Sequence, residues 1–316
     1  MKKFFIVGCP RSGTTMVQQA LNRHSQVVIP PETKFFFSFY GHSRVRQLRH
    51  VARLDADLGV SLPRPARRVS SPEEGRAFYE EMARQYVERL GRVRVTCFGE
   101  KTPEHSGHLG RVRELFPTAK VVVLYRDGRD VALSLTKVPW MSPDLYVNFL
   151  VWLYYDRVLR GARAAGCPGL HFARYEDVVA DPARELGAIL EFLDLRYEAA
   201  VAEGWGNRDG IPRREYAWKA RALEKITQER VGLFRRELSA EQVGALERLG
   251  GPALTSHGYE LLTDGRAPWP AGFRLGVALN LSRLLCRLPW HLLARELLAR
   301  SWPPCGSSPL PAPAPA

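Results

Sequence analysis

The sequence predicts an α/β fold in which helices flank a mostly parallel central sheet. Residues 4–7 form an apolar run that ends in a glycine- and hydroxyl-rich loop, and residues 14–24 behind that loop have a helical pattern. A second apolar run, at residues 121–125, ends directly at Arg126. Apolar runs and helical patterns then alternate along the chain, which is typical of parallel strands joined by crossover helices.

The remaining elements follow the same alternation. Extended segments are predicted at residues 27–31, 93–98, 120–125 and 170–175. Helices are predicted at residues 78–90, 105–116, 145–165, 182–193, 218–238 and 240–249. The aromatic residues of the long helix over 145–165 form one stripe, which favours a place in the core over a ligand site.

The loop after the first strand has the composition of a phosphate-binding loop. Gly8 and Gly13 let the backbone turn tightly, so that the amides of residues 12–15 can point at one anion at a helix N-terminus. The spacing follows G-x-x-x-x-G-K-[ST] except at the lysine position, where Thr14 stands, and the nearby cation is Arg11. An ordinary strand-to-helix turn is the simpler alternative.

The second strand ends in a cation, whereas a nucleoside-triphosphate hydrolase has a carboxylate there to hold magnesium. Arg126 offers a fork of donors suited to a phosphate, so the pattern indicates an anionic nucleotide held by side-chain cations without a metal. Ser134 follows about two helical turns later, and both side chains would face one crevice if the two strands are parallel neighbours. The alternatives are a salt bridge from Arg126 to Asp127, Asp130 or Glu100, and a solvated hydroxyl at Ser134.

Together these motifs resemble the sulfotransferases that use 3′-phosphoadenosine 5′-phosphosulfate (PAPS). The matching blocks are PRSGTT at residues 10–15, EKTPEH at 100–105, LFPTAKVVVLYRD at 115–127, YRDGRDVALS at 125–134 and RYEDVVADPARELGAILEFLDL at 174–195. Their order and spacing agree with the family over roughly residues 4–260. The resemblance implies the P-loop NTPase-like sulfotransferase fold, PAPS as co-substrate and no metal.

The resemblance also implies which residues hold the donor. The 5′-phosphosulfate would be bound by Arg11 and by the amides of Ser12, Gly13, Thr14 and Thr15. The 3′-phosphate would be bound by Arg126 and Ser134, and Tyr175 would pack near the adenine. A plain core tyrosine is the alternative for Tyr175.

Sulfuryl transfer needs a base for the acceptor proton and positive charge at the leaving phosphate. Glu32 is the leading candidate for the base, because a helix N-terminus after residues 27–31 could aim its carboxylate at the phosphate loop. It also resembles the catalytic glutamate of the protein-tyrosine sulfotransferase branch. A charge that merely favours a helix dipole is the alternative. His105 is the rival base.

Two cations complete the predicted catalytic set. Lys101 is expected either to stabilise the leaving phosphate or to pair with a carboxylate such as Glu100. Arg11 is expected to act in catalysis as well as in binding, because it lies inside the phosphate loop.

The composition is that of a globular enzyme with an excess of positive charge. Hydrophobic residues make up 45% of the 316 residues, and the formal net charge is +13. The charge favours anionic ligands or surfaces. Nucleic acid is not expected as a partner, because the chain has no zinc-finger spacing, no RNP-like aromatic strand and no lysine-rich run.

Cysteine usage and hydropathy predict a cytoplasmic location. The five cysteines are scattered without a C-x-x-C pair, which fits a reducing compartment. The start MKKFFIVGC resembles a lipoprotein signal, but its apolar stretch is too short for one. No run reaches the roughly 18 apolar residues of a membrane-spanning helix.

The domain organisation is predicted as a sulfotransferase domain over residues 1–265 with two extensions. Residues 40–75, rich in Arg, Pro and Ser, indicate an insertion near the acceptor pocket rather than core. Residues 205–214 are either a lid over the nucleotide or a solvated loop. Residues 266–300 form a basic amphipathic extension, in which residues 272–300 either lie on an anionic membrane as a peripheral contact or pack on the domain. Residues 301–316 are too rich in Pro and Ala for a core and are predicted to be disordered.

The sequence therefore predicts an enzyme that moves a sulfuryl group from PAPS to an acceptor hydroxyl or amine and releases adenosine 3′,5′-bisphosphate. Glycan, lipid, small metabolite and peptide tyrosine all remain open as acceptors. Two rivals belong to other classes. A P-loop nucleotide kinase or hydrolase would need magnesium and a triphosphate, and the missing loop lysine counts against it. A non-catalytic, membrane-associated nucleotide-binding protein would keep Arg126 but lack a working base.

Overall fold

The computed structural model describes residues 1–203, 210–212, 215–264, 269, 273, 276–280 and 282. A sheet of five parallel strands, in the order β2-β3-β1-β4-β5, lies at its centre. The strands are β1 (Lys2–Gly8), β2 (Val27–Val28), β3 (Cys97–Lys101), β4 (Lys120–Tyr125) and β5 (Leu170–Arg174). The predicted α/β fold with a parallel sheet is confirmed.

The central strand, β1, is buried on both faces. Phe4 and Ile6 pack into the core on one face of the sheet, and Phe5 and Val7 pack into the core on the other, as side-chain alternation along a strand requires. Covered faces on both sides explain why the strand reads as a continuous apolar run. In the register of the sheet, Gly8 pairs with Leu124 of β4. The carboxyl ends of β1 and β4 therefore lie side by side, as predicted.

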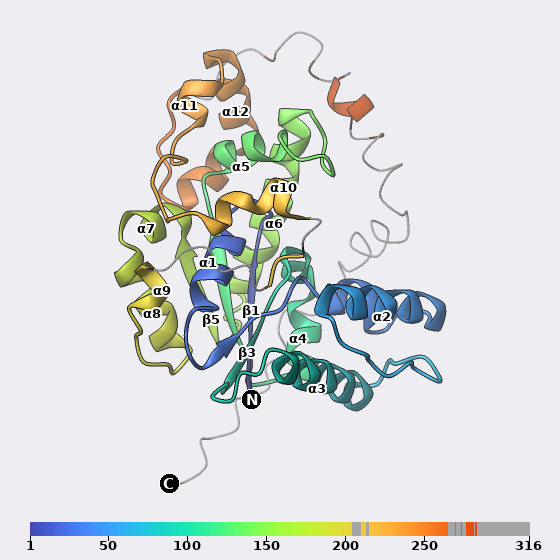
Figure 1. Cartoon of the computed structure of the whole chain (residues 1–316). Coiled ribbons are helices and arrows are strands. Elements are labelled where there is room, and N and C mark those ends of the chain that lie inside the picture. The colour runs from blue at the N-terminus through green and yellow to red at the C-terminus, as the bar shows by residue number, and fades with distance from the viewer. Residues whose placement is uncertain are drawn as a thin grey trace.

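Helices cover both faces of the sheet (Figure 1). The Phe4 face is covered by α1 (Thr14–Leu21), α7 (Tyr175–Ala180), α8 (Pro182–Phe192) and α9 (Ala200–Glu203). The Phe5 face is covered by α2 (Arg44–Leu58), α3 (Pro72–Arg89), α4 (Leu109–Leu115) and the short turn η1 (Phe35–Phe39).

A third group of helices packs beyond the carboxyl end of β4. This group is α5 (Gly128–Leu135), α6 (Leu145–Ala164) and α12 (Ala240–Ser256). Phe149 and Trp152 of α6 are buried among them, which confirms that the predicted aromatic stripe belongs to the core. Ser239 begins α12 with a capping box, in which its side chain accepts from the Gln242 amide.

The segment 40–75 contributes to the core, so the expectation that it lies outside the core is wrong. It contains α2, whose Val51, Leu54 and Leu58 are at most 1% exposed. The spacing of these residues is that of one helix face, and the many arginines that obscured it in the sequence are spread over the other faces.

Several boundaries differ from the predicted ones, among them those of β3 and of the segment that follows it. The strand expected at residues 93–98 begins at Cys97 and runs on through Glu100 and Lys101, because these two charged residues pair with Phe5 and Ile6 of β1. The helix expected at residues 105–116 is instead a 3-10 turn, η2 (Pro103–His108), followed by α4.

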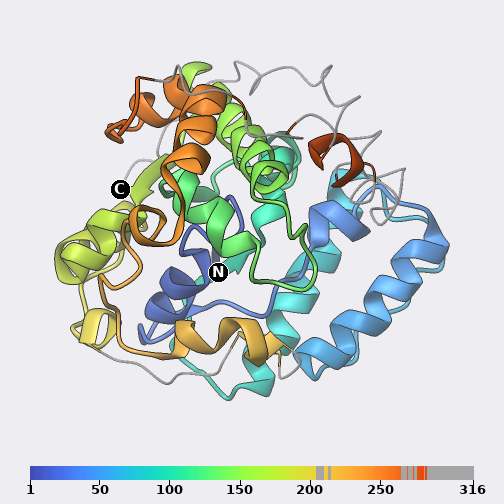
Figure 2. The same cartoon turned by 90° about the horizontal axis from the view of Figure 1, so that it is seen from above.

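The single helix expected at residues 218–238 is wrong. The chain forms α10 (Tyr216–Lys219), the 3-10 turn η4 (Ala220–Leu223) and α11 (Phe234–Glu237), with irregular backbone at residues 224–233. Asp130 of α5 accepts hydrogen bonds from the amides of Gly232 and Phe234, at 2.8 and 2.9 Å, and this contact holds the chain out of a helix. We call residues 215–230 the cover segment. Seen from above, it runs alongside α1, against which η4 packs (Figure 2).

Several predicted features lie outside the described residues. They are most of the lid candidate at 205–214, most of the basic extension at 266–300 and the whole tail at 301–316. Over the part of the chain that is described, no helix is both long enough and apolar enough to span a bilayer. Cys9 and Cys97 are free and buried, whereas Cys167 is disulfide-bonded, which the scattered spacing of the cysteines did not predict.

Candidate active site

A cavity of about 290 Å³ opens where β1 and β4 end, a position at which doubly wound sheets bind ligands. Its walls come from the phosphate loop, the loop after β2, the turn η2, the helices α5 and α7, and the cover segment. The predicted site residues that line it are Arg11, Gly13, Thr14, Thr15, Glu32, Arg126, Ser134 and Tyr175. The predicted residues that do not line it are Ser12, Lys101 and His105.

The phosphate loop has the tight geometry that its glycines indicated. Gly13 has a φ of 90°, and a β-carbon there would lie 2.5 Å from the Tyr175 ring. The first hydrogen bond of α1 runs from the Val17 amide to the Gly13 carbonyl, at 3.1 Å. The amides just before Val17 therefore have no carbonyl of the helix to bond, and they lie at a helix N-terminus, a position that favours an anion.

Ser12 has a different place from the predicted one. Its amide donates to the Cys9 carbonyl at 3.1 Å, and its side chain is fully buried. Because this hydrogen bond closes the turn, the Ser12 amide is not among those that face the cavity.

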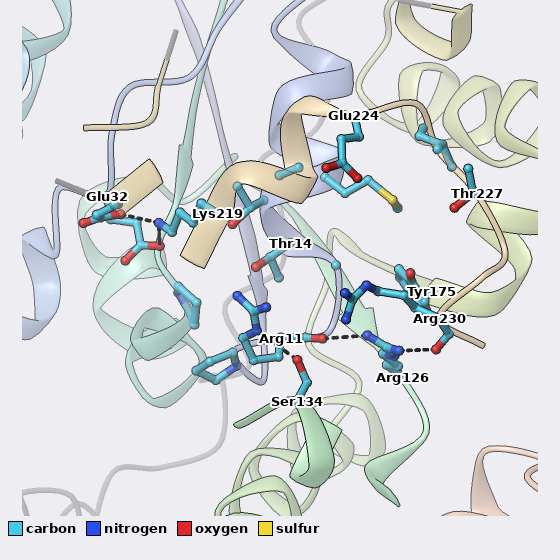
Figure 3. A pocket seen from close by; sticks show the side chains of 18 of the residues that line it. Arg11, Thr14, Glu32, Arg126, Ser134, Tyr175, Lys219, Glu224, Thr227 and Arg230 are labelled. Carbon is cyan, nitrogen blue, oxygen red and sulfur yellow. Dashed lines mark hydrogen bonds and ion pairs between the residues drawn. The ribbon is translucent and has the colours of Figure 1, made fainter. Parts of the chain in front are cut away.

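Arginines gather at one end of the cavity. Figure 3 shows Arg11, Arg126 and Arg230 grouped near Tyr175, with Glu32 and Lys219 at the other side. Arg11 donates to Ser134 Oγ at 3.1 Å, and Arg126 donates to the Arg11 carbonyl at 3.3 Å. Burial, and to a smaller extent the charges of Arg126 and Arg230, lower the pKa of Arg11 to about 10. Three like charges in a buried place favour an anion with more than one negative charge.

Neighbouring elements hold Arg126 in position. Its guanidinium lies 4.2 Å from the centre of the Tyr175 ring. Trp152 of α6 donates to the Arg126 carbonyl at 3.1 Å. Of the salt bridges considered for Arg126, the structure shows a 3.5 Å contact with Asp130, whereas Asp127 pairs with Arg129 at 2.7 Å.

The other end of the cavity holds a carboxylate between lysines. Glu32 forms ion pairs with Lys101 and, at 2.8 Å, with Lys219 of the cover segment. Burial raises the pKa of Glu32, but Lys101, Lys219 and Lys34 outweigh burial, so the pKa lies well below its ordinary value. Burial lowers the pKa of Lys101 to about 8, while Glu32 acts to raise it. Glu32 is thus ionised and held toward the cavity by its lysine partners.

The expected helix N-terminus at Glu32 is absent from this loop. Glu32 precedes Lys34, which has a left-handed φ of 52°, and the turn η1 that follows has π-helical geometry. The lysines, rather than a helix dipole, fix the direction of the carboxylate.

His105, the rival base, is fully buried in the core. Its Nε2 accepts from the Phe36 amide at 3.2 Å, and its Nδ1 lies 3.5 Å from Glu100. Burial holds its pKa well below the usual range. Lys101, for which Glu100 was named as a possible partner, pairs with Glu32 instead.

Sequence reasoning missed Lys219 and Arg230, two of the basic residues of the cover segment that line the cavity. Both lie in a stretch that was predicted as one continuous helix, which hid which residues face the cavity. The available signal was the density of basic residues after residue 213. Among the described residues, no group of His, Cys, Asp and Glu is arranged to hold a metal ion.

Comparison with known proteins shows the family of this chain. A sequence model described as "Sulfotransferase family" matches residues 3–199. The chain belongs to this sulfotransferase family. The resemblance that the two strand-end motifs indicated is therefore confirmed.

Individual relatives of this chain are distant. Nodulation protein NoeE of Sinorhizobium fredii is 26% identical over 284 residues, covering 81% of this chain and 65% of NoeE. Protein-tyrosine sulfotransferase 2 of Gallus gallus is 26% identical over 221 residues, covering 64% of this chain and 53% of that protein. The chain thus spans less than two thirds of the length of either relative.

The fold of this chain agrees with a solved structure. The sulfotransferase domain of the Synechococcus PCC 7002 olefin synthase superposes with a TM-score of 0.59 at 21% identity, covering 82% of this chain and 96% of that domain. The predicted sulfotransferase fold is confirmed.

Proposed function

We propose that the protein transfers a sulfuryl group from PAPS to an acceptor hydroxyl or amine and releases adenosine 3′,5′-bisphosphate. One observation carries this proposal. A single cavity has a helix N-terminus and an arginine group at one end and an ionised, lysine-held glutamate at the other. Membership of the sulfotransferase family supports the same reaction.

The donor would bind at the arginine end. The 5′-phosphosulfate is assigned to Arg11 and to the amides of Gly13, Thr14 and Thr15, which face the cavity at the start of α1. The 3′-phosphate is assigned to Arg126, Arg230 and Ser134. Ser134 Oγ accepts from Arg11, so its own proton is available for donation to a phosphate oxygen. Tyr175 is assigned to the nucleotide because its ring lines the same wall.

The acceptor would enter at the Glu32 end. Its oxygen or nitrogen attacks the sulfur in line, the bond from sulfur to the 5′-phosphate oxygen breaks, and Glu32 takes the acceptor proton. The acceptor atom becomes much more acidic as it bonds to sulfur, so a carboxylate with a low pKa suffices as the base. Arg11 would stabilise the charge that develops on the leaving phosphate.

Lys101 has a different proposed role from the one first expected. Because it pairs with Glu32 and does not line the cavity, we assign it to holding the base rather than to the leaving phosphate. His105 is not proposed as a base, because it lies in the core. The membrane contact through residues 272–300 and the cytoplasmic location stay predictions.

Replacement of Glu32 by Gln tests the reaction. PAPS is incubated with a panel of a phenol, a simple glycoside and an amino sugar, and bisphosphate release is measured. Loss of a general base lowers kcat by about 100- to 10,000-fold, while affinity for the bisphosphate product stays unchanged. Glu224→Gln is the matched control, since Glu224 also lines the cavity. Equal rates in the two variants would remove Glu32 from the mechanism, and no turnover with any acceptor would argue for the non-catalytic alternative.

A further inference from the structure

The loop that carries Glu32 rests on a buried polar network. We use this term for Thr33, Glu100, Thr102 and His105, each of which is 0% exposed. None of them lines the cavity. Buried polar side chains are costly unless they are hydrogen-bonded, so the bonds within this network show what the residues hold in place.

Glu100 accepts from two threonine hydroxyls with one carboxylate oxygen. Thr33 Oγ1 donates to Glu100 Oε1, and Thr102 Oγ1 donates to the same oxygen at 3.1 Å. Each hydroxyl has its proton directed at the carboxylate, so its lone pairs are free to accept from elsewhere. Glu100 therefore orients both hydroxyls as acceptors.

The partners of these acceptors are consecutive amides of the Glu32 loop. The Lys34 amide donates to Thr102 Oγ1 at 3.3 Å, and the Phe35 amide donates to Thr33 Oγ1 at 3.2 Å. The Phe36 amide donates to His105 Nε2 at 3.2 Å. The network thus replaces the backbone partners that these amides would have in a regular helix or strand.

Strand β3 holds the loop from two sides. Glu100 and Lys101 are successive residues of β3, so their side chains point to opposite faces of the sheet. Lys101 holds the Glu32 carboxylate directly, whereas Glu100 holds the backbone next to it through Thr33. On the other side of Thr33, its carbonyl accepts from Arg53 at 2.7 Å and lies 2.8 Å from His50 Nε2.

We propose that Glu100 and His105 are positioning residues, which set the place of the Glu32 carboxylate through Thr33 and Phe36. Neither touches substrate. The proposal rests on the proposed function only in naming Glu32 as the base. Whether the network places Glu32 against Lys101 is measurable without any acceptor.

The titration of Lys101 reports where Glu32 lies. Lysine side chains are labelled with carbon-13, and the pKa of Lys101 is followed by NMR. Because Glu32 acts to raise the pKa of Lys101, Glu32→Gln lowers that pKa by about 1–3 units. Thr33→Val removes the link to Glu100 without changing Glu32 or Lys101, and we expect it to produce at least half of this fall.

Two further variants separate positioning from general damage. Glu100→Gln keeps an oxygen that accepts from both threonines, so we expect the Lys101 titration of the wild type. Ser106→Ala removes a buried hydroxyl of the turn η2 that bonds to Pro103 and Gly8, outside the Glu32 loop. We expect it to leave the titration unchanged, even if it lowers stability as much as Thr33→Val does.

Two results would overturn the proposal. In the first, Thr33→Val leaves the pKa of Lys101 at its wild-type value although Glu32→Gln shifts that pKa. In the second, Glu32→Gln itself leaves the pKa of Lys101 unchanged. If Thr33→Val does not fold, amide exchange in the wild-type protein decides. The Lys34, Phe35 and Phe36 amides must then be protected, and rapid exchange at all three contradicts the network.

Turnover rates of the variants are an independent test, which also tests the proposed function. If Thr33 acts through Glu32, the double variant Thr33→Val, Glu32→Gln is no slower than Glu32→Gln alone, because the two changes remove one effect. Additive losses would contradict the positioning role and leave the sulfotransferase reaction intact. A silent Glu32→Gln would instead remove the proposed base.

Discussion

Arg126 is a central side chain of the proposed donor site. It stacks on Tyr175, lines the cavity and contacts the backbone of both other arginine-bearing segments. A hydrogen bond to a charged group contributes roughly 1.5–3 kcal/mol, so Arg126→Ala weakens binding of adenosine 3′,5′-bisphosphate by about 10- to 150-fold.

Calorimetric titration checks this effect on the donor. Arg184→Ala, on the exposed surface of α8, is the matched control and keeps the wild-type affinity. Arg126→Lys keeps the charge but loses the planar fork, so its affinity falls between those of the wild type and Arg126→Ala. Wild-type affinity in Arg126→Ala would remove the 3′-phosphate assignment.

Glu100 gives the protein a dependence of stability on pH. Burial raises its pKa to about 7, above the ordinary value of 4.5, although nearby hydroxyls act to lower it. The Glu100 carboxyl group therefore binds a proton more tightly in the folded state than in the unfolded state. As a result, the stability of the fold falls as pH rises from about 4.5 to about 7. At pH 8 the cost is about 3 kcal/mol at most.

The Glu100→Gln variant removes that titration. We expect it to melt at a higher temperature than the wild type at pH 8 and to lose this advantage at pH 5. Thermal unfolding at both values measures the difference. An equal advantage at the two pH values would show that Glu100 does not titrate in this range.

Among the elements, the turn from β1 into α1 is fixed by contact with α7. Gly13 has a left-handed φ, and a β-carbon there would meet the Tyr175 ring at 2.5 Å. Gly91 also has a left-handed φ, of 65°, but a β-carbon there would meet nothing within 4 Å. The two glycines thus share the backbone strain and differ in the steric clash.

This pair makes a matched experiment. Gly91→Ala costs about 1–2 kcal/mol of stability from strain alone, and it leaves donor binding unchanged. Gly13→Ala costs more and also weakens binding of the bisphosphate, because the Tyr175 ring or the loop must move. Urea unfolding and calorimetry measure the two quantities. Equal effects of the two substitutions would show that the Tyr175 contact does not constrain the loop.

Local sequence patterns predicted those elements that are decided by residues close together in the sequence. The apolar runs ending at Gly8 and Arg126 gave β1, β4 and the arginine end of the cavity, because neighbours in sequence decide those features. Lys219 was not predicted, because its bond to Glu32 joins residues 187 positions apart. The same holds for Arg230, whose segment is held by Asp130 through contacts that no short motif records.

Charged residues also led to wrong predictions about which segments lie in the core. The arginines of α2 concealed a core helix, and Glu100 and Lys101 were not expected inside a strand. His105 was expected as the rival base, but the fold places it under the loop of Glu32. In each case tertiary contacts, rather than local pattern, decide the role of the residue.

For the chain as a whole, the sheet brings the two ends of the cavity together. β1 and β4 end at the arginine group, and β3 carries Lys101, which pairs with Glu32, so strand order places the arginines and Glu32 on one edge of the sheet. The net charge of +13 attracts an anionic donor from whichever direction it approaches the protein. The kinase alternative would need magnesium and a triphosphate at the same edge.

The most direct test is calorimetric titration of the protein with adenosine 3′,5′-bisphosphate, with adenosine 5′-phosphate and ATP plus magnesium as controls. We expect the bisphosphate to bind at least about tenfold more tightly than either control, because the 3′-phosphate adds charged hydrogen bonds to Arg126 and Arg230. Equal affinity for adenosine 5′-phosphate, or tighter binding of ATP with magnesium, would contradict the assignment of this cavity to PAPS.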